Sequence, residues 1–461
     1  MLKPTSHALG SSFRDPSGFV FHSSGVLYRQ VNQSYRDNYD LLLGSGLYDD
    51  LVKAGLLIPH VEANRPEGAT ESAYRVIKPR LVGFVSYPYE WCFSQLKDAA
   101  LATLAIQKRA IEYGMILKDA SAYNIQFVDG KPTLIDTLSF ERYREGQPWI
   151  AYKQFCQHFL GPLALMCYRD VRLGQMMRTH IDGIPLDLTS ALLPRRTRLS
   201  FSLLTNIHLH ARSQQRHASK PRASQRRGMS RRAMLGLVDS LESGVKRLRW
   251  QAKDTAWADY YDHTNYEAES LDHKEQLVAE YLKLTQPSVI WDLGANIGRF
   301  SRIAAELGIE SIAFDLDPAA VEKNYLECLR ADEKRILPLV LDLTNPSPAI
   351  GWEHSERMSL LERGPVDLVL ALALIHHLAI GNNVPLESIA RFIRGCCRSL
   401  IIEFVPKEDS QVKRLLASRE DIFDEYSEAG FESAFAHHFS IEKETAVSGS
   451  SRKIYLMRAK S

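Results

Sequence analysis

The chain is poor in cysteine, has no long apolar run and carries almost no net charge, and each of these absences excludes a class of protein. Its six cysteines show no Cys-x-x-Cys spacing, so neither a disulfide framework nor a zinc ribbon is expected. We expect the protein to be in a reducing compartment. No apolar run reaches the roughly 18 residues of a transmembrane helix, and the N-terminus lacks the apolar core of a secretory signal. The net charge of +2 indicates no class of partner. We therefore expect a cytoplasmic protein that, at 461 residues, has roughly two to three domains.

The most informative segment is the run 289–298 (VIWDLGANIG) in the second half. An apolar, strand-like segment reaches Asp292, a Gly-x-x-x-Gly turn follows, and a helix is expected to begin at Arg299. Gly294 and Gly298 lack a Cβ, so the backbone can turn tightly and let a ligand approach. The run has neither the dinucleotide pattern Gly-x-Gly-x-x-Gly nor the Gly-Lys-Ser/Thr ending of a phosphate loop. An ordinary tight turn between a strand and a helix is the alternative explanation.

Further strand-like segments follow this run, separated by helical ones. Strands are expected at 311–315, 336–341, 366–374, 399–405, 439–443 and 453–458, and helices at 274–283, 318–330 and 387–394. This alternation predicts a parallel, doubly wound α/β sheet, in which ligands lie beyond the carboxyl ends of the strands. The polar residues expected at those ends are Asp292, Asp315, Asp342, His376, His377 and Glu403.

These motifs together resemble the class I S-adenosylmethionine (AdoMet) methyltransferases, whose first motif is Asp-x-Gly-x-x-x-Gly, over roughly residues 255–461. The resemblance implies a Rossmann-like sheet closed by an antiparallel hairpin. It also implies a set of AdoMet-binding residues, namely Asp292, Gly294, Ala295, Asn296, Gly298, Asp315, Asp342 and Tyr266.

The resemblance implies separate roles for the members of this set. Asp315 would hold the ribose, because one carboxylate can accept from both hydroxyls. Asp342 would lie at the adenine ring. Tyr266, or Tyr261 before it, would stack on AdoMet or restrain its sulfonium, since aromatic faces attract cations. The alternative is that these tyrosines pack the following helix against the sheet.

Methyl transfer to a hydroxyl needs in-line positioning and a base that removes the proton. His376 and His377 lie where enzymes of this class place acceptor-facing residues, and a histidine titrates in the useful range. Adjacent side chains at a strand end are expected to diverge, so one or both are expected to be structural and a metal site is not expected. Glu403 is the other candidate base, and it can equally hold a backbone amide or pair with Arg391 or Arg394.

A different pattern occupies the first half. Asp119 and Asn124 are five residues apart, and two short strands expected at 125–128 and 133–135 enclose an Asp-Gly turn and end at Asp136. This pattern resembles the catalytic loop and metal-binding strand of the protein-kinase-like superfamily. The resemblance implies an α+β domain that uses ATP, with Asp119 as base and Asn124 and Asp136 as Mg²⁺ ligands.

Departures from the kinase pattern leave this activity open. The histidine before the catalytic aspartate is absent, and Asp136 is followed by Thr137 rather than Phe-Gly. The Gly-rich loop is reduced to 21–25 (FHSSG), with Arg29 or Lys78 in place of the nucleotide-clamping lysine. A chance arrangement and a pseudokinase that binds a partner or the acceptor are the alternatives.

A basic segment, 212–232, separates the halves and contains no acidic residue. Its like charges and low hydrophobicity predict a solvated linker, which can also contact an anionic membrane surface or a polyanionic substrate. No nucleic-acid module accompanies it. A helix is expected at 234–248, next to this segment.

The sequence therefore predicts three parts: a kinase-like domain at 1–195, a basic linker with a connecting helix at 196–254, and a methyltransferase domain at 255–461. Fusions of this kind act on bacterial surface polysaccharides. Segments 403–410 and 419–423 also resemble the NoeA-like nodulation proteins of rhizobia, a resemblance that covers the last part only.

Three functions are compatible with these patterns. The first, which we favour, is AdoMet-dependent O-methylation of a glycan or other hydroxyl acceptor such as a small molecule, with the first domain positioning the acceptor or a partner. The second is a bifunctional kinase–methyltransferase that uses ATP and Mg²⁺. The third is a non-catalytic AdoMet-binding scaffold. In each case we expect a cytoplasmic location, free or at the face of the inner membrane.

Overall fold

The chain divides into two compact units. A computed structural model describes residues 8–212, 228–251, 268–417 and 419–460. The first unit comprises Met1–Gln251 with Ile350–Arg357, and the second comprises Ala252–Ala349 with Met358–Ser461. The sequence predicts 196–254 as a separate connecting part, whereas residues up to Gln251 group with the first unit. Tyr261, Tyr266 and most of the basic segment lie outside the described residues.

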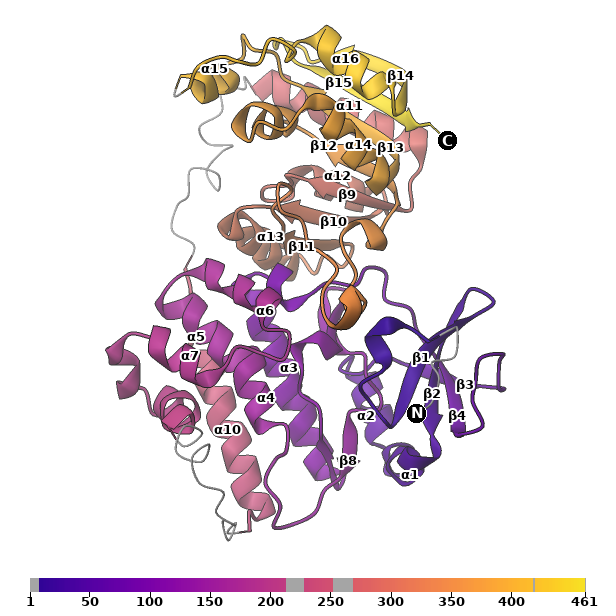
Figure 1. Ribbon diagram of the computed structural model, residues 1–461, viewed down its shortest axis with the longest axis vertical. Helices are drawn as coiled ribbons and strands as arrows, with labels where there is room; N and C mark the ends of the chain where they lie inside the picture. Colours follow the sequence, from indigo (N-terminus) through magenta and orange to yellow (C-terminus); the bar gives the residue numbers. More distant parts are fainter. Residues whose placement is uncertain (1–7, 213–227, 252–267, 418, 461) are drawn as a thin grey trace. The chain divides into compact units, whose positions relative to one another are not determined.

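The second unit is built on a seven-stranded sheet with the order β11-β10-β9-β12-β13-β15-β14 (Figure 1). Its strands are β9 Val289–Leu293, β10 Glu310–Asp315, β11 Ile336–Val340, β12 Val366–Ala371, β13 Cys397–Phe404, β14 Phe439–Ala446 and β15 Lys453–Ala459. Strands β9 to β13 pair in parallel, and β15 pairs antiparallel with both β13 and β14. The predicted parallel, doubly wound sheet and its closing hairpin are confirmed.

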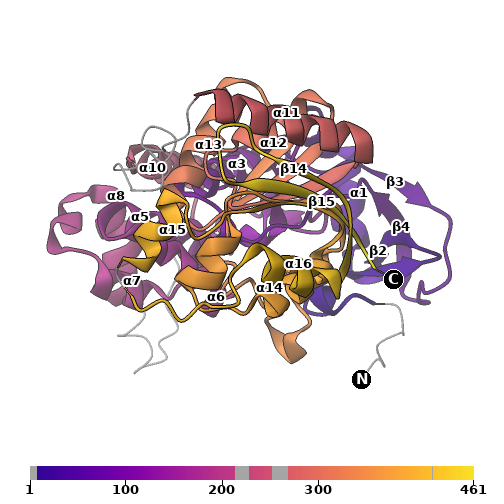
Figure 2. The same cartoon turned by 90° about the horizontal axis from the view of Figure 1, so that it is seen from above.

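Helices cover both faces of this sheet, because its strands are apolar on both sides. The helices are α11 Ala268–Thr285, α12 Arg299–Glu306, α13 Pro318–Arg330, α14 Leu386–Cys396, α15 Ser410–Leu416 and α16 Glu428–Ala436. In Figure 2, α11, α12 and α13 lie on one side of the strands, and α14 and α16 lie on the other. The core between α11, α12 and the strands includes Val278, Ile290, Phe300, Leu370 and Ile401.

The first unit combines antiparallel strands with a mainly helical part. Four strands form a sheet in the order β1-β2-β4-β3, and two smaller sheets pair β5 with β8 and β6 with β7. The strands are β1 Gly18–Ser23, β2 Val26–Asn32, β3 His60–Ala63, β4 Ala73–Pro79, β5 Met115–Leu117, β6 Ile125–Val128, β7 Lys131–Leu134 and β8 Phe140–Arg142. The helices are α1 Arg36–Gly44, α2 Leu47–Lys53, α3 Phe93–Glu112, α4 Tyr152–Phe155, α5 Gly161–Tyr168, α6 Met176–Thr179, α7 Leu186–Leu192, α8 Phe201–Leu203 and α10 Arg231–Arg247. The predicted hairpin around the Asp-Gly turn is confirmed, whereas a kinase-like identity stays a prediction.

Helix α10, close to the predicted range 234–248, packs against α3 within the first unit (Figure 1). It buries one stripe of side chains at helical spacing, namely Met234, Val238, Leu241 and Val245. Lys108 on α3 forms an ion pair of 2.6 Å with Asp239 and a second with Glu242. The helix after the basic segment is therefore part of the packed first unit.

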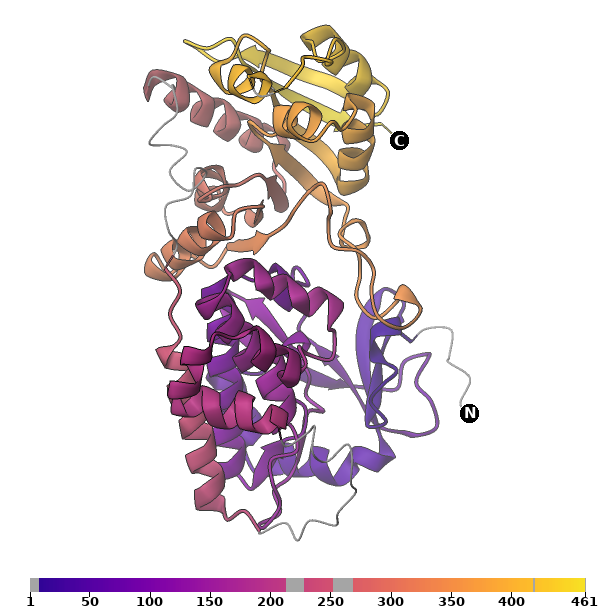
Figure 3. The ribbon, with the colours of Figure 1, turned by 60° about the vertical axis from the view of Figure 1, so that its left-hand side comes forward.

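A short excursion of the chain, Ile350–Arg357, groups with the first unit although its sequence neighbours group with the second (Figure 3). The buried Glu356 accepts a hydrogen bond of 2.7 Å from the Arg14 guanidinium. The Arg357 guanidinium lies 4.4 Å from the centroid of the Tyr123 ring, where a cation is attracted to the aromatic face. These contacts attach the excursion to the first unit, and nothing in the sequence predicts them.

Candidate functional site

The loop between β9 and α12 turns through left-handed backbone. Gly294, Asn296 and Gly298 have φ angles of +78°, +51° and +81°. Glycine adopts this region without a steric penalty, and asparagine tolerates it. A Cβ at Gly298 would also lie 2.5 Å from the Asn324 side chain. Glycine is therefore needed at position 298 for two independent reasons, and the tight turn predicted from the sequence is confirmed.

Asp315, at the end of β10, holds this loop in place. One carboxylate oxygen accepts from the Asn296 N–H at 2.7 Å, and the other accepts from the Asp317 N–H at 2.8 Å. Burial raises the pKa of Asp315 to about 6. A carboxylate that already orders the glycine loop is also placed to accept from a ligand that lies against the loop.

Asp292, at the end of the adjacent strand β9, is the second carboxylate of the site. Its Oδ2 accepts a hydrogen bond of 2.7 Å from the Ser301 hydroxyl, which is a neutral donor. Burial raises the pKa of Asp292 to about 6, and the negative charge of Asp315 adds to this rise. The structure therefore brings together two carboxyl groups that the sequence places on separate strands.

The other predicted AdoMet-binding residues lie at the same edge of the sheet. Ala295 is buried, and its N–H donates to the Phe314 carbonyl at 2.9 Å. Asp342 follows β11, the strand next to β10, and its Oδ1 accepts from the N–H and the hydroxyl of Thr344. The described members of the predicted set therefore gather at the carboxyl ends of three neighbouring strands.

His376 and His377 lie side by side after β12, with ring centroids 4.1 Å apart. The expectation that their side chains diverge is wrong. It assumed extended backbone, whereas the chain has left strand geometry before them and is helical from Ile375 on. Ala373, between β12 and the histidines, has a φ of +50°, a strained conformation for a residue with a Cβ.

The two histidines differ in exposure but share a neutral state. His376 is fully buried, and neither of its ring nitrogens has a hydrogen-bond partner among the residues that the structure describes. His377 is partly exposed. Burial lowers the pKa of His377 to about 4 and that of His376 well below its usual value. Both imidazoles are therefore neutral at pH 7, but each is a weaker base than an exposed histidine, because burial disfavours its protonated form.

Glu403, the third predicted base, is part of a buried ion network. Lys274 Nζ donates to its Oε2 at 2.5 Å, and Arg452 lies 3.5 Å from its Oε1. Arg452 also donates to Asp409 at 2.8 Å. The suggested pairing of Glu403 with Arg391 or Arg394 is therefore wrong. Those arginines lie on α14, whereas the actual cations come from α11 and from the turn before β15.

Sequence reasoning missed the cations of this network. Lys274 lies on a helix whose apolar pattern predicts only packing, and Arg452 lies in a turn that carries no motif. Burial lowers the pKa of Lys274, while Glu403 opposes that fall. The charge of Asp292 also opposes the fall in the pKa of Lys274.

The kinase-like residues of the first unit also come together. Asp119 accepts from the Ser121 N–H at 2.9 Å and from the Gln154 amide at 2.8 Å. Burial raises the pKa of Asp119, and Asp136 adds to this rise through its charge, whereas the buried amide nitrogen of Asn124 donates no hydrogen bond among the described residues. The convergence that the sequence suggested is therefore present.

The Mg²⁺ implied by the kinase resemblance does not fit this arrangement. Arg29 forms an ion pair of 2.7 Å with Asp136 Oδ1, which also accepts from the Leu138 N–H, and Ser139 donates to Oδ2 at 2.6 Å. Both oxygens of the predicted metal ligand are thus engaged by donors of the chain itself. Within the described ranges, no group of three or more His, Cys, Asp or Glu side chains is arranged to hold a metal ion.

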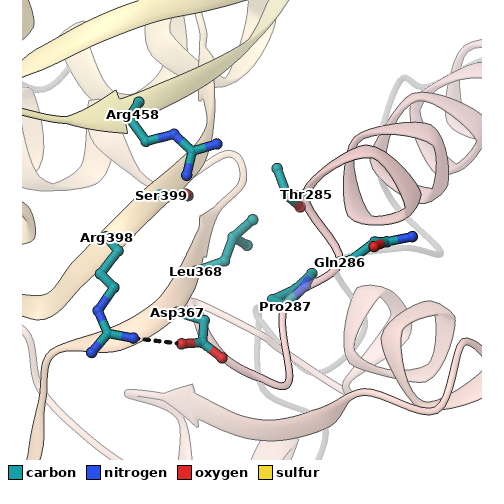
Figure 4. A pocket seen from close by; sticks show the side chains of 8 residues that line it. All are labelled: Thr285, Gln286, Pro287, Asp367, Leu368, Arg398, Ser399 and Arg458. Carbon is teal, nitrogen blue, oxygen red and sulfur yellow. Dashed lines mark hydrogen bonds and ion pairs between the residues drawn. The ribbon is translucent and has the colours of Figure 1, made fainter.

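A separate cavity opens at the opposite edge of the second unit's sheet, where β12 and β13 begin (Figure 4). Its lining residues are Thr285, Gln286, Pro287, Asp367, Leu368, Arg398, Ser399 and Arg458. Arg398 donates to Asp367 at 3.0 Å across one side of it. Ligands of parallel sheets lie at the carboxyl edge, so this cavity is distinct from the candidate site.

Comparison with known proteins shows a relative that matches along the whole chain. The nodulation protein NoeA of Rhizobium meliloti (strain 1021) is 37% identical over 460 residues, which are 98% of this chain and 96% of that protein. The chain belongs to the NoeA family of nodulation proteins. The resemblance expected for the last part only therefore extends over both units. No family model matches the chain.

Several solved structures align with less than half of the chain. The PH0226 protein of Pyrococcus horikoshii OT3 has 16% identity and a TM-score of 0.33, covering 44% of this chain and 99% of that one. Magnesium protoporphyrin IX methyltransferase of Synechocystis PCC 6803 with bound SAH has 17% identity and a TM-score of 0.32, covering 44% and 93%. The N-methyltransferase NodS of Bradyrhizobium japonicum WM9 has 10% identity and a TM-score of 0.30, covering 42% and 99%. TM-scores this low give no information about the function of the chain, so function is inferred from the residues of the site.

Proposed function

We propose that this chain is an AdoMet-dependent methyltransferase. The observation that carries the proposal is the joint geometry of β9 and β10. The buried carboxyl group of Asp292 and the partly exposed one of Asp315 lie at the ends of adjacent parallel strands, and Asp315 holds a left-handed glycine loop through the Asn296 N–H. A loop with glycine at both of its ends, beside two hydrogen-bond acceptors, suits a ligand that carries hydroxyl and amino groups.

The residues of the site fit AdoMet in distinct roles. Asp315 accepts from the ribose hydroxyls, and the ammonium of the amino acid part faces Asp292. A Cβ at Gly294 would approach only Leu374, at 3.4 Å, so the loop surface at this position is free for a ligand. AdoMet, when bound, supplies an electrophilic methyl group. The protein has to orient this group, exclude water and accept the proton that the acceptor loses.

His377 is the residue that we assign as the base for a hydroxyl acceptor. It is neutral at pH 7, and its partial exposure lets an acceptor reach it. His376 packs against its ring and is buried, which suits a residue that holds His377 in position. Glu403 is engaged by Lys274 and Arg452, and we assign it to the support of the site rather than to proton transfer.

The acceptor class that we propose is a hydroxyl of a glycan or of another small molecule. It rests on the resemblance of the chain to two-part proteins that act on surface polysaccharides, with the first unit binding the acceptor or a partner. The cofactor assignment does not depend on this choice, so it can be tested first.

Calorimetric titration of AdoMet tests the cofactor assignment. The wild type should bind AdoMet, and Asp315→Ala should bind it about 10- to 100-fold more weakly, because a hydrogen-bonding charge is lost. Asp367→Ala is the matched control, since Asp367 also accepts from two backbone N–H groups, but at the opposite edge of the same sheet. Equal weakening by the two variants would mean that only the fold was disturbed, and no binding by folded wild type would overturn the proposal. Methyl transfer to an acceptor would then separate an enzyme from a non-catalytic scaffold.

The affinity for AdoMet should also decrease as the pH is lowered. The ligand needs the carboxylate form of Asp315, and the raised pKa of about 6 means that this form is lost as the pH falls below 6. Protonation of Asp315 alone should make the affinity about fourfold lower at about pH 5.5 than at about pH 7.5, and protonation of Asp292, whose pKa is also about 6, should lower it further. Asp315→Asn has no titrating group at this position and should show a flatter profile. A wild-type profile as flat as that of the variant would contradict the role of Asp315.

A further inference from the structure

An apolar surface patch bordered by arginines lies on the first unit, outside the sites described above. Leu199 has 90% of its surface exposed, Phe201 71% and Leu209 45%. The cations around them are Arg195, Arg196, Arg198 and Arg212, all exposed. We call these seven residues the arginine-rimmed patch. Single exposed apolar residues are common, but a bulky apolar group among like charges needs an explanation.

The local fold explains why these apolar side chains project outward. Helix α8 continues into a π-helical turn, Leu204–Leu209, which packs on α7. Ser202 of α8 lies so close to α10 that a Cβ at Gly244 would be 2.1 Å from its hydroxyl. Residues 201, 205 and 209 follow each other at four-residue spacing, so they share the face that points away from this packing. In Figure 2, α8 lies at the margin of the first unit.

The Thr205 hydroxyl on this outward face already has a hydrogen-bond partner in its own helix. The Thr205 hydroxyl donates to the Phe201 carbonyl at 2.8 Å, so it offers no donor to a partner. The face between the arginines is therefore apolar, and a partner has to provide an apolar phase.

The charge around the patch is positive without local compensation. None of its four arginines forms an ion pair with a carboxylate among the described residues. Arg196 instead lies over the Tyr168 ring, at 5.9 Å from its centroid. In the sequence, no acidic residue occurs between Asp187 and Asp239, and eleven Lys and Arg do. The patch therefore sits in a strongly cationic segment.

We propose that the arginine-rimmed patch docks the protein on an anionic lipid bilayer. Leu199, Phe201 and Leu209 enter the boundary between head groups and acyl chains, and the arginines contact the lipid phosphates. A bilayer surface offers an apolar phase beneath a layer of negative charge, which is the complement of this patch. None of the helices in the described part of the chain has the length and apolarity to cross a membrane, so the attachment is at the surface. Nucleic acid would match the arginines, but it would leave the two leucines in water.

Co-sedimentation with lipid vesicles tests this proposal on the full-length chain. The wild type should bind vesicles of phosphatidylcholine mixed with phosphatidylglycerol, bind phosphatidylcholine alone far less, and lose binding as salt is raised. Leu199→Glu with Phe201→Glu should weaken binding about tenfold or more, because two apolar groups no longer enter the lipid. Val61→Glu with Leu81→Glu is the control, since it changes two other exposed apolar residues of the first unit and should leave binding unchanged.

Other outcomes would overturn the proposal. Vesicle binding that survives in the Leu199 and Phe201 double variant would show that the patch is not the docking surface. Tight binding of single-stranded RNA, unchanged in this variant, with no vesicle binding, would assign the cationic segment to nucleic acid. A wild-type dimer in sedimentation velocity that the double variant abolishes, again without vesicle binding, would make the patch a contact between two copies. A triple variant, Arg195→Gln with Arg196→Gln and Arg198→Gln, keeps the apolar residues of the patch. It should bind anionic vesicles with less preference over neutral ones.

Discussion

Replacing Lys274 with Met is expected to lower the free energy of unfolding of the second unit by about 3–5 kcal/mol. Lys274 Nζ and Glu403 Oε2 are 2.5 Å apart, and their side chains are 4% and 0% exposed. Without the ammonium, the Glu403 carboxylate remains buried with Arg452 at 3.5 Å as its remaining described ion-pair partner. A buried charge that loses a partner is much more costly than the pair is favourable. Hydrogen exchange of peptides from β12 and β13 measures this loss within the second unit.

Two further variants make the test of Lys274 specific. Lys443→Met removes an ion pair with Glu280 of 3.0 Å at the surface, and it should leave the stability of the second unit nearly unchanged. Lys274→Met combined with Glu403→Leu should recover part of the loss, since Arg452 keeps Asp409 as its partner at 2.8 Å. A single Lys274→Met variant as stable as Lys443→Met would show that the buried pair has no structural role.

Replacing Gly298 with Ala is expected to be the most damaging change in the glycine loop, costing about 2–5 kcal/mol of stability and abolishing AdoMet binding. The new Cβ would have to adopt a φ of +81° and would lie 2.5 Å from the Asn324 side chain. Relief of this contact requires the buried Asn324 amide to turn away, which breaks the hydrogen bond of 3.0 Å that it accepts from Arg302. Thermal unfolding and calorimetric titration of AdoMet measure the two effects.

Gly308 provides the matched control for backbone strain. Its φ is +82°, nearly that of Gly298, but a Cβ there would meet no atom within 4 Å. Gly308→Ala should therefore cost only the left-handed strain, about 1–2 kcal/mol, and leave AdoMet binding intact. Equal losses for the two variants would show that strain alone explains the glycine at 298, and that the contact with Asn324 is relieved freely.

The architecture of the second unit and the place of its candidate site could be predicted from the sequence alone. Strands such as β9 and β12 are continuous apolar runs, and the loop at Gly294 and Gly298 has a local backbone requirement, so both leave a signal over a few neighbouring residues. The parallel order of the strands then places Asp292 and Asp315 at one edge without further information.

Which side chains meet within and outside that site could be seen only in the folded chain. Lys274 and Glu403 are 129 residues apart, and the ion pair between Arg29 and Asp136 also joins distant parts of the sequence. No local sequence pattern could therefore predict either pair. The contact between the two histidine rings depends on where β12 ends, and the exposure of Leu199 and Phe201 depends on how α8 packs. Periodicity and turn chemistry act between near neighbours, whereas ion pairing and burial depend on distances that exist only after the chain has folded.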